Sequence, residues 1–160
     1  MDTAYIETTV IGHLVGRDHP NPVIAGRQTV TRAWWSTAPS SYRLLASQLV
    51  IEECSGGDPE AAAERVVALR IVELVEASVD VDSLATALTD AGAVPASEPR
   101  DAYHIAIAAV NGVKYLVTWN FKHIANAVMR DRIEMVCCAA GFEPPIICTP
   151  DELLGVDDGS

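Results

Sequence analysis

The sequence predicts an α/β domain built on a parallel sheet whose two faces are covered by helices. Three observations lead to this prediction: short uncharged apolar segments have the length of buried strands, longer segments of helical period alternate with them, and Gly, Pro and Asn separate the two kinds. The chain has 160 residues, 49% of them hydrophobic and 21% charged, which is typical of a globular domain with a core. We expect one domain over residues 1–154 and a disordered tail over 155–160.

The elements expected in the first half of the chain follow from apolar runs and breaker residues. They are a strand at 4–6, a helix from 10 to 15, a helix at 23–35, a loop at 36–41, a strand at 42–47 and a helix that carries residues 50–53. Asp58 suits an N-cap and Pro59 suits the first helical turn, so another helix is expected to start there and to continue to Leu74.

The second half repeats the alternation of strands and helices. The expected elements are a strand at 76–81, a helix at 82–91, an apolar helix at 102–110, a strand at 115–118, a helix at 121–138, a strand at 145–149 and a helical turn at 150–154. Gly92 and Gly141 are expected to end the helices that precede them.

The sequence favours a cytoplasmic protein with no membrane partner. No basic segment followed by an apolar one opens the chain, and the longest apolar run, at 105–110, is too short to cross a bilayer. The four cysteines form no CxxC pair and have no zinc-finger spacing to histidine, so buried free thiols in a reducing compartment are expected.

The net charge of −11 argues against a protein that binds nucleic acid through a broad basic surface. Residues 1–50 differ from the rest, because they hold four arginines and only three carboxylates. Divalent cations in an acidic site would also reverse the charge locally. The charge therefore restricts a nucleic-acid hypothesis to a local site.

Four acidic or amide side chains fall near the carboxyl ends of predicted strands. They are Glu7, Glu53, Asp101 and Asn120. The ligand crevice of an open parallel sheet lies beyond this edge, so these distant residues can converge there. Crowded carboxylates need a cation between them, and oxygen ligands without cysteine or clustered histidine favour Mg²⁺ or Mn²⁺. Such an ion polarises a phosphodiester and activates water, so the sequence predicts a metal-dependent phosphodiester-cleaving site.

Each of these four positions also has a structural interpretation. Glu7 suits the solvated end of a strand, and Glu53 suits the solvated face of a helix. Asp101 suits an N-cap, and Asn120 suits the turn between a strand and a helix. The prediction therefore depends on their joint placement.

Two histidines and two tryptophans also have both a structural and a functional interpretation. His104 follows Asp101 by one helical turn and His123 follows Asn120, and both are expected to be hydrogen-bonding neighbours and not ligands. Trp34 and Trp35 either stack on RNA or pack in the core, and we favour the core. No phosphate-loop, dinucleotide or nucleophile-elbow signature is present.

Four segments carry a resemblance to a known family. They are YIETT at 5–9, SQLVIEE at 47–53, DAYHIAIA at 101–108 and YLVTWNFKHIAN at 115–126. Together they resemble the PIN-domain family, and more closely its bacterial branch of toxins from type II toxin–antitoxin pairs, the VapC-like proteins. The likeness runs in the expected order from residue 4 to about 154.

The resemblance implies a three-layer α/β/α sandwich with a mainly parallel sheet. It also implies a metal-dependent endoribonuclease that cleaves RNA, pairs with a small antitoxin protein and is often a homodimer. The family's four acidic positions fall on Glu7, Glu53, Asp101 and Asn120, and its hydroxyl positions fall on Thr8 and Thr118.

Two positions depart from the family pattern. The first acidic position is usually Asp, and Glu7 is one methylene longer; the fourth is commonly Asp, and Asn120 supplies a neutral oxygen. These departures leave three alternatives open: an enzyme that uses one metal ion, a slow enzyme, or an inactive relative. The rival hypotheses are a PIN-like binding or regulatory module without turnover, and a metal phosphatase of small phosphate esters, which has no basic phosphate clamp nearby beyond Arg100 and Lys122.

Overall fold

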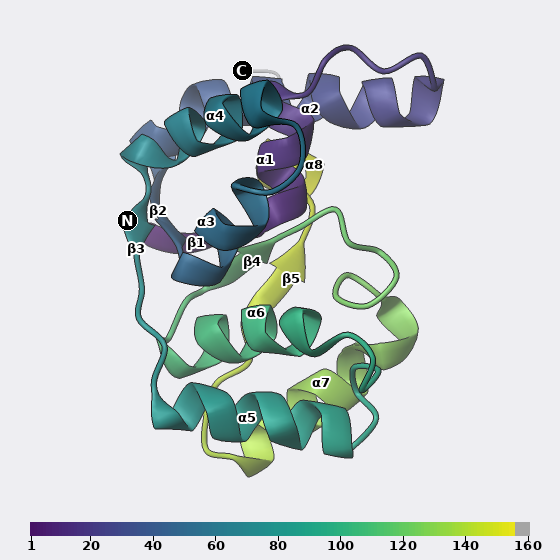
Figure 1. The fold of residues 1–160 in the computed structure, drawn as a ribbon. Coiled ribbons are helices and arrows are strands. Elements are labelled where there is room, and N and C mark those ends of the chain that lie inside the picture. The colour runs from purple at the N-terminus through teal and green to yellow at the C-terminus, as the bar shows by residue number, and fades with distance from the viewer. Residues whose placement is uncertain (156–160) are drawn as a thin grey trace.

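A five-stranded parallel sheet lies at the centre of the computed structural model, which describes residues 1–155 (Figure 1). Its strands are β1 (Asp2–Ile6), β2 (Tyr42–Ala46), β3 (Glu73–Leu74), β4 (Tyr115–Val117) and β5 (Ile146–Cys148). They run in the order β3-β2-β1-β4-β5, and every neighbouring pair is parallel. Tyr5 in β1 pairs with Leu45 on one side and with Leu116 on the other. The predicted parallel sheet is confirmed.

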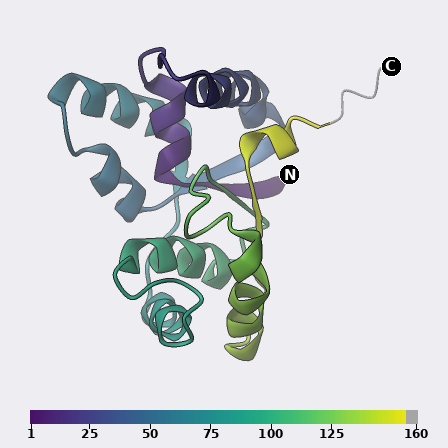
Figure 2. The same cartoon turned by 90° about the vertical axis from the view of Figure 1, so that its right-hand side faces the viewer.

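Helices cover both faces of this sheet. They are α1 (Thr8–Val15), α2 (Pro22–Ser41), α3 (Gln48–Cys54), α4 (Pro59–Ala68), α5 (Val79–Asp90), α6 (Pro99–Val110), α7 (Ala127–Ala139) and α8 (Pro150–Leu153), with a 3₁₀ turn, η1, at Leu69–Ile71. The helices α1 to α4 lie on one side of the sheet, and α5, α6 and α7 lie on the other (Figures 1 and 2). The three-layer α/β/α sandwich is therefore confirmed.

The strand order changes direction between β1 and β4. From β1 the chain adds β2 and β3 toward one edge, and β4 and β5 then extend the sheet toward the other edge. An open parallel sheet leaves a crevice at the carboxyl ends of the two strands where this reversal occurs. Glu7 follows β1 there, and its backbone N–H donates to the Val117 carbonyl of β4 at 3.1 Å.

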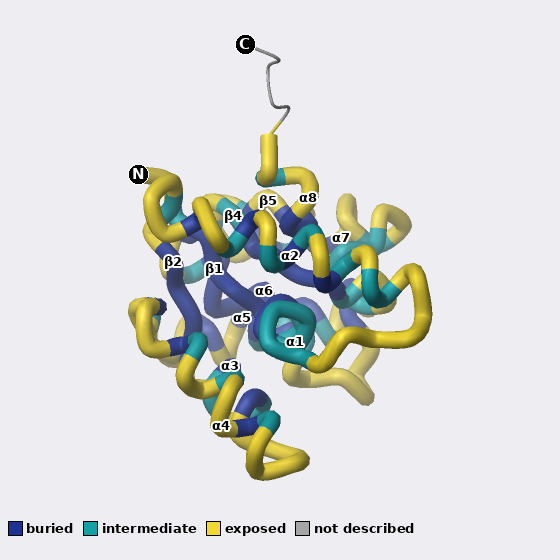
Figure 3. Tube along the Cα trace, turned by 90° about the horizontal axis from the view of Figure 1, so that it is seen from above, coloured by how far each residue is buried: buried dark blue, intermediate teal, exposed yellow. Residues whose placement is uncertain are grey.

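The core fills the space between the sheet and the two helix layers. Figure 3 shows buried chain at the centre and exposed chain around it. The largest wholly buried side chains include Tyr5, Trp34, Ile105 and Leu116. The core interpretation of Trp34 is confirmed, and Trp35 is partly buried against the same cluster.

The loop expected at 36–41 is wrong, because α2 continues to Ser41. Ser36 and Thr37 donate their hydroxyls to backbone carbonyls of the preceding turn, and Ala38 is buried in the core. Pro39 lies in the last turn, where its missing N–H removes only one helical hydrogen bond. Core contact thus outweighs the turn-forming composition of this segment.

The strand expected at 76–81 is also wrong. The strand β3 lies earlier, at Glu73–Leu74, where the expected helix to Leu74 has already ended, and α5 begins at Val79. Ser78 caps α5 by accepting a hydrogen bond from the Val81 N–H at 3.3 Å. Asp80 and Asp82 lie in the first turn, where the helix dipole favours acidic residues.

The helix expected from residue 121 begins only at Ala127. Asn126 is its N-cap and accepts from the Val128 N–H at 3.0 Å. The preceding residues form a turn in which the N–H groups of Ile124 and Ala125 donate to the Asn120 carbonyl. The tail predicted at 155–160 lies, apart from Gly155, outside the described residues. No helix within residues 1–155 combines the length and the apolar character that a membrane crossing needs.

Candidate active site

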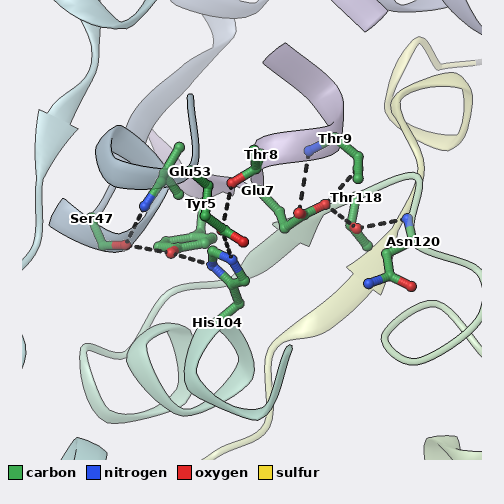
Figure 4. A network of polar contacts seen from close by, with 10 residues as sticks. Tyr5, Glu7, Thr8, Thr9, Ser47, Glu53, His104, Thr118 and Asn120 are labelled. Atoms are coloured by element: carbon green, nitrogen blue, oxygen red, sulfur yellow. Dashed lines mark hydrogen bonds and ion pairs between the residues drawn. The ribbon is translucent and has the colours of Figure 1, made fainter. Parts of the chain in front are cut away.

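Glu7 is a buried carboxylate that forms the N-cap of α1. Its side chain is 3% exposed, so the interpretation as a solvated strand end is wrong. Its Oε1 accepts hydrogen bonds from the Thr9 hydroxyl at 2.5 Å and from the Thr118 hydroxyl at 2.6 Å, and its Oε2 accepts from the Thr9 N–H at 3.2 Å (Figure 4). The two hydroxyls and the N-terminus of α1 thus give this buried carboxyl group the hydrogen-bond partners that burial requires.

The two threonines that hold Glu7 also connect its neighbours. Thr118 accepts a hydrogen bond from the Asn120 N–H at 2.9 Å, and Thr9 accepts one from the Trp119 N–H at 2.8 Å. The segment that leaves β4 is thereby fixed against the segment that leaves β1. This arrangement explains why a hydroxyl is needed at Thr118, which is fully buried.

Glu53 lies on α3 and is bound on one oxygen. Its Oε1 accepts from the Thr8 hydroxyl at 2.8 Å and lies 2.6 Å from Nε2 of His104. Burial acts to raise the pKa of the Glu53 carboxyl, but the hydrogen bond and charge of His104, together with the Thr8 hydroxyl, offset this and leave the pKa below its usual value. No hydrogen bond to its Oε2 is found among residues 1–155, so this oxygen is available to a ligand.

His104 belongs to a buried chain of polar side chains that reaches back to β2. Its Nδ1 lies 2.8 Å from the Tyr5 hydroxyl, which lies 2.7 Å from the Ser47 hydroxyl, and Ser47 accepts from the Val50 N–H at 3.4 Å (Figure 4). Because a carboxylate only accepts, Nε2 of His104 carries the proton shared with Glu53. His104 is therefore a hydrogen-bonding neighbour of the acidic set, as expected.

Asp101 lies in the first turn of α6, and the N-cap of that helix is Glu98. The interpretation of Asp101 as the N-cap is therefore wrong. Burial raises the pKa of its carboxyl, and the charge of Glu7 acts in the same direction, whereas a side-chain hydrogen bond with Asn120 and the nearby His123 lower it. Asp101 thus lies in the field of Glu7 and in contact with Asn120.

Hydrogen bonds fix both the backbone and the side chain of Asn120. Its N–H donates to Thr118, and its side-chain Oδ1 accepts from the His123 N–H at 3.0 Å. The turn interpretation of Asn120 is therefore correct, and the same residue also contacts Asp101. His123 is half-buried, and its charge acts to lower the pKa of the Asp101 carboxyl.

The predicted residues thus meet as three linked pairs: Glu7 with Thr118, Glu53 with His104 and Asp101 with Asn120. Within the described part of the chain, no three or more His, Cys, Asp or Glu side chains are grouped so that they could hold a metal ion. Convergence of Glu7, Glu53 and Asp101 on one ion therefore stays a prediction. The donor chemistry fits Mg²⁺ or Mn²⁺, because the groups are carboxylate and amide oxygens, which these ions prefer.

Three residues of this network were not predicted from the sequence: Tyr5, Thr9 and Ser47. One signal for Tyr5 was present, because it lies two residues before Glu7 and therefore on the same face of the strand. A buried tyrosine also needs a hydrogen-bond partner for its hydroxyl. The identity of that partner, His104, depends on tertiary packing.

Comparisons with family models, with curated proteins and with solved structures returned no match. The site is therefore described by its own residues: a buried carboxyl group, Glu7, at the switch point of a parallel sheet, with the half-buried Glu53 and Asp101 on neighbouring helices.

Proposed function

We propose that this chain is a Mg²⁺- or Mn²⁺-dependent endoribonuclease and acts as the toxin of a type II toxin–antitoxin pair. The observation that carries the proposal is the nearly inaccessible carboxyl group of Glu7 at the β1/β4 switch point, together with the half-buried carboxyl group of Asp101, whose pKa Glu7 helps to raise. Repulsion between two partly buried carboxylates costs stability, and a cation would remove it, so this pair favours a cation-dependent function. The toxin role, the small antitoxin partner and a homodimer are supported by the sequence resemblance alone.

The bound ion would polarise the scissile phosphodiester and lower the pKa of water. In this proposal Glu7 and Asp101 hold the ion, and Thr118 and Thr9 fix the carboxylate of Glu7 in position. Glu53 completes the pocket and orients the attacking water, and His104 and Thr8 hold its carboxylate in position by binding one oxygen only.

The remaining residue of the set, Asn120, holds the scissile phosphate through its amide. Its N–H donates to the Thr118 hydroxyl and its Oδ1 accepts from the His123 N–H, and these two hydrogen bonds fix its position. Because the amide adds no negative charge beside Asp101, it favours a single ion over two.

Cleavage of a labelled single-stranded RNA, with Mn²⁺ and with a chelator, tests the proposal. We expect cleavage by the wild type with Mn²⁺, none with the chelator, and none by Asp101→Asn, whose folded state is checked by its thermal melting. Asp131→Asn changes an exposed acidic residue of α7 in the same way and should cleave like the wild type. Equal cleavage by the wild type and Asp101→Asn would contradict the proposal, and hydrolysis of a simple aryl phosphate would favour a phosphatase.

A second candidate function is a PIN-like binding module without turnover. The neutral Asn120 favours it, because the family's fourth carboxylate is missing at that position. This candidate predicts that the wild type neither cleaves RNA nor takes up Mn²⁺. Growth arrest on expression of the wild type, but not of Asp101→Asn, would favour the toxin role.

A further inference from the structure

Arg27 projects from α2 over two aromatic rings beside the candidate active site. Its guanidinium carbon lies 4.9 Å from the centre of the Phe121 ring and 5.7 Å from that of Trp119. These rings meet edge to face at 5.9 Å. We call Arg27, Trp119 and Phe121 the arginine–aromatic platform.

The guanidinium of Arg27 has no acidic partner within residues 1–155. Other cations do: Arg32 pairs with Asp18, Arg43 with Glu73 and Lys114 with Asp2. The Arg27 side chain also donates no hydrogen bond to a described residue, whereas Arg65 and Arg132 donate to backbone carbonyls. Its N–H groups are thus available to a ligand, in a chain whose net charge is −11.

The platform is fixed in position by hydrogen bonds that lead to Glu7. The Trp119 indole donates to the Thr31 hydroxyl at 2.8 Å, and that hydroxyl donates to the Arg27 carbonyl at 2.6 Å. At its other end the Trp119 N–H donates to Thr9, which itself donates to Glu7. The tryptophan is 8% exposed, so it is a rigid support more than a contact surface.

The exposed part of the platform suits single-stranded nucleic acid. Phe121 is 44% exposed, and Lys122 beside it is exposed as well. Base stacking on an aromatic ring together with a guanidinium on the phosphate is the common chemistry of single-strand binding. A planar guanidinium pairs with phosphate oxygens through two N–H groups at once.

We propose that the arginine–aromatic platform binds the RNA strand next to the scissile bond, with a phosphate on Arg27 and a base on Phe121. This inference rests on the proposed function, because it assigns the substrate path of the same site. An acidic protein can hold RNA in this way because the contact with the RNA phosphates is confined to a few unpaired cations beside the acidic residues.

Binding of a fluorescent oligouridylate, measured by anisotropy with Ca²⁺ in place of Mn²⁺, tests the platform without cleavage. We expect Arg27→Ala and Phe121→Ala each to weaken binding about fivefold or more. Arg27→Lys keeps the charge but loses the planar pairing, so it should fall between Arg27→Ala and the wild type. Arg70→Ala, an exposed arginine of η1, removes the same charge and should bind RNA like the wild type.

The salt dependence gives a second readout. Loss of one phosphate contact should lower the slope of log K against log salt by about 0.7 in Arg27→Ala and leave it unchanged in Arg70→Ala. No binding by the wild type, or equal binding by the Arg27→Ala and Arg70→Ala proteins, would overturn the inference. Displacement of the RNA by polyglutamate as effectively as by unlabelled RNA would assign the platform to acidic protein segments and overturn it too.

The outcomes separate this inference from the proposed function. Arg27-dependent binding without any Mn²⁺-dependent cleavage would refute the ribonuclease and leave the platform standing. Cleavage with binding that is independent of Arg27 would refute the platform alone.

Discussion

His104 contacts Glu53 and Tyr5 with its two ring nitrogens, at 2.6 Å and 2.8 Å. The ring is fully buried, so its orientation is set by these two partners and not by water. A carboxylate at the edge of the sheet is thereby tied to the interior of the core through Tyr5 and Ser47. Substitutions in this row of hydrogen-bonded side chains (Ser47, Tyr5 and His104) are therefore expected to affect both the stability of the fold and the position of Glu53.

Replacing Tyr5 by Phe should destabilise the protein by about 1–3 kcal/mol, because the His104 Nδ1 and the Ser47 hydroxyl lose a partner in a buried environment. The free energy of unfolding in urea measures this. Tyr42→Phe is the matched control, since the Tyr42 hydroxyl makes no hydrogen bond within residues 1–155, and its effect should stay within about 0.5 kcal/mol. Equal stability of Tyr5→Phe and the wild type would show that the buried hydrogen bonds of the Tyr5 hydroxyl do not form.

Replacing Thr118 by Val keeps the shape of the side chain and removes the hydroxyl that binds Glu7 and the Asn120 N–H. We expect Mn²⁺ affinity to fall about 10–100-fold, as it does when partners that orient a metal-binding carboxylate are lost. Thr86→Val, on the exposed face of α5, should bind Mn²⁺ like the wild type. Unchanged Mn²⁺ affinity in Thr118→Val would show that the Thr118 hydroxyl does not position Glu7 for metal binding.

The four cysteines should differ sharply in reactivity. Burial raises the pKa of Cys54 and Cys137 to about 11 and that of Cys148 to about 12, whereas Cys138 is exposed. The thiolate is the reactive form, so a chromogenic disulfide reagent near neutral pH should modify one thiol quickly and the others only after unfolding. Cys138→Ser should abolish the fast phase. A fast phase that persists in this variant would mean that one of the three buried thiols is accessible.

Much of the fold could be predicted from the sequence because strand and helix periods are local properties. The uncharged strand around Leu116 and the apolar helix that carries Ile105 were predicted on this basis and are present. Errors arose where tertiary contact or capping decides the outcome. Ala38 extends α2 through a segment rich in Ser and Pro, and Ser78 caps a helix within the range 76–81 where a strand was predicted.

The candidate site shows the same division. The placement of Glu7 and Asn120 at one edge of the sheet follows from their positions after β1 and β4, which sequence order predicts. The hydrogen bond from Thr118 to Glu7 and the contact of His104 with Tyr5 join side chains that are more than 90 residues apart. Such contacts have no local signal, and the importance of Trp119 over the Trp34–Trp35 pair was missed for that reason.

Calorimetric titration with Mn²⁺ tests the central claim most directly, because that claim is that Glu7 and Asp101 together hold a cation. We expect the wild type to bind Mn²⁺, and we expect both Glu7→Gln and Asp101→Asn to lose this binding while they remain folded. Absence of Mn²⁺ binding by the wild type, or undiminished binding by Asp101→Asn, would contradict the account.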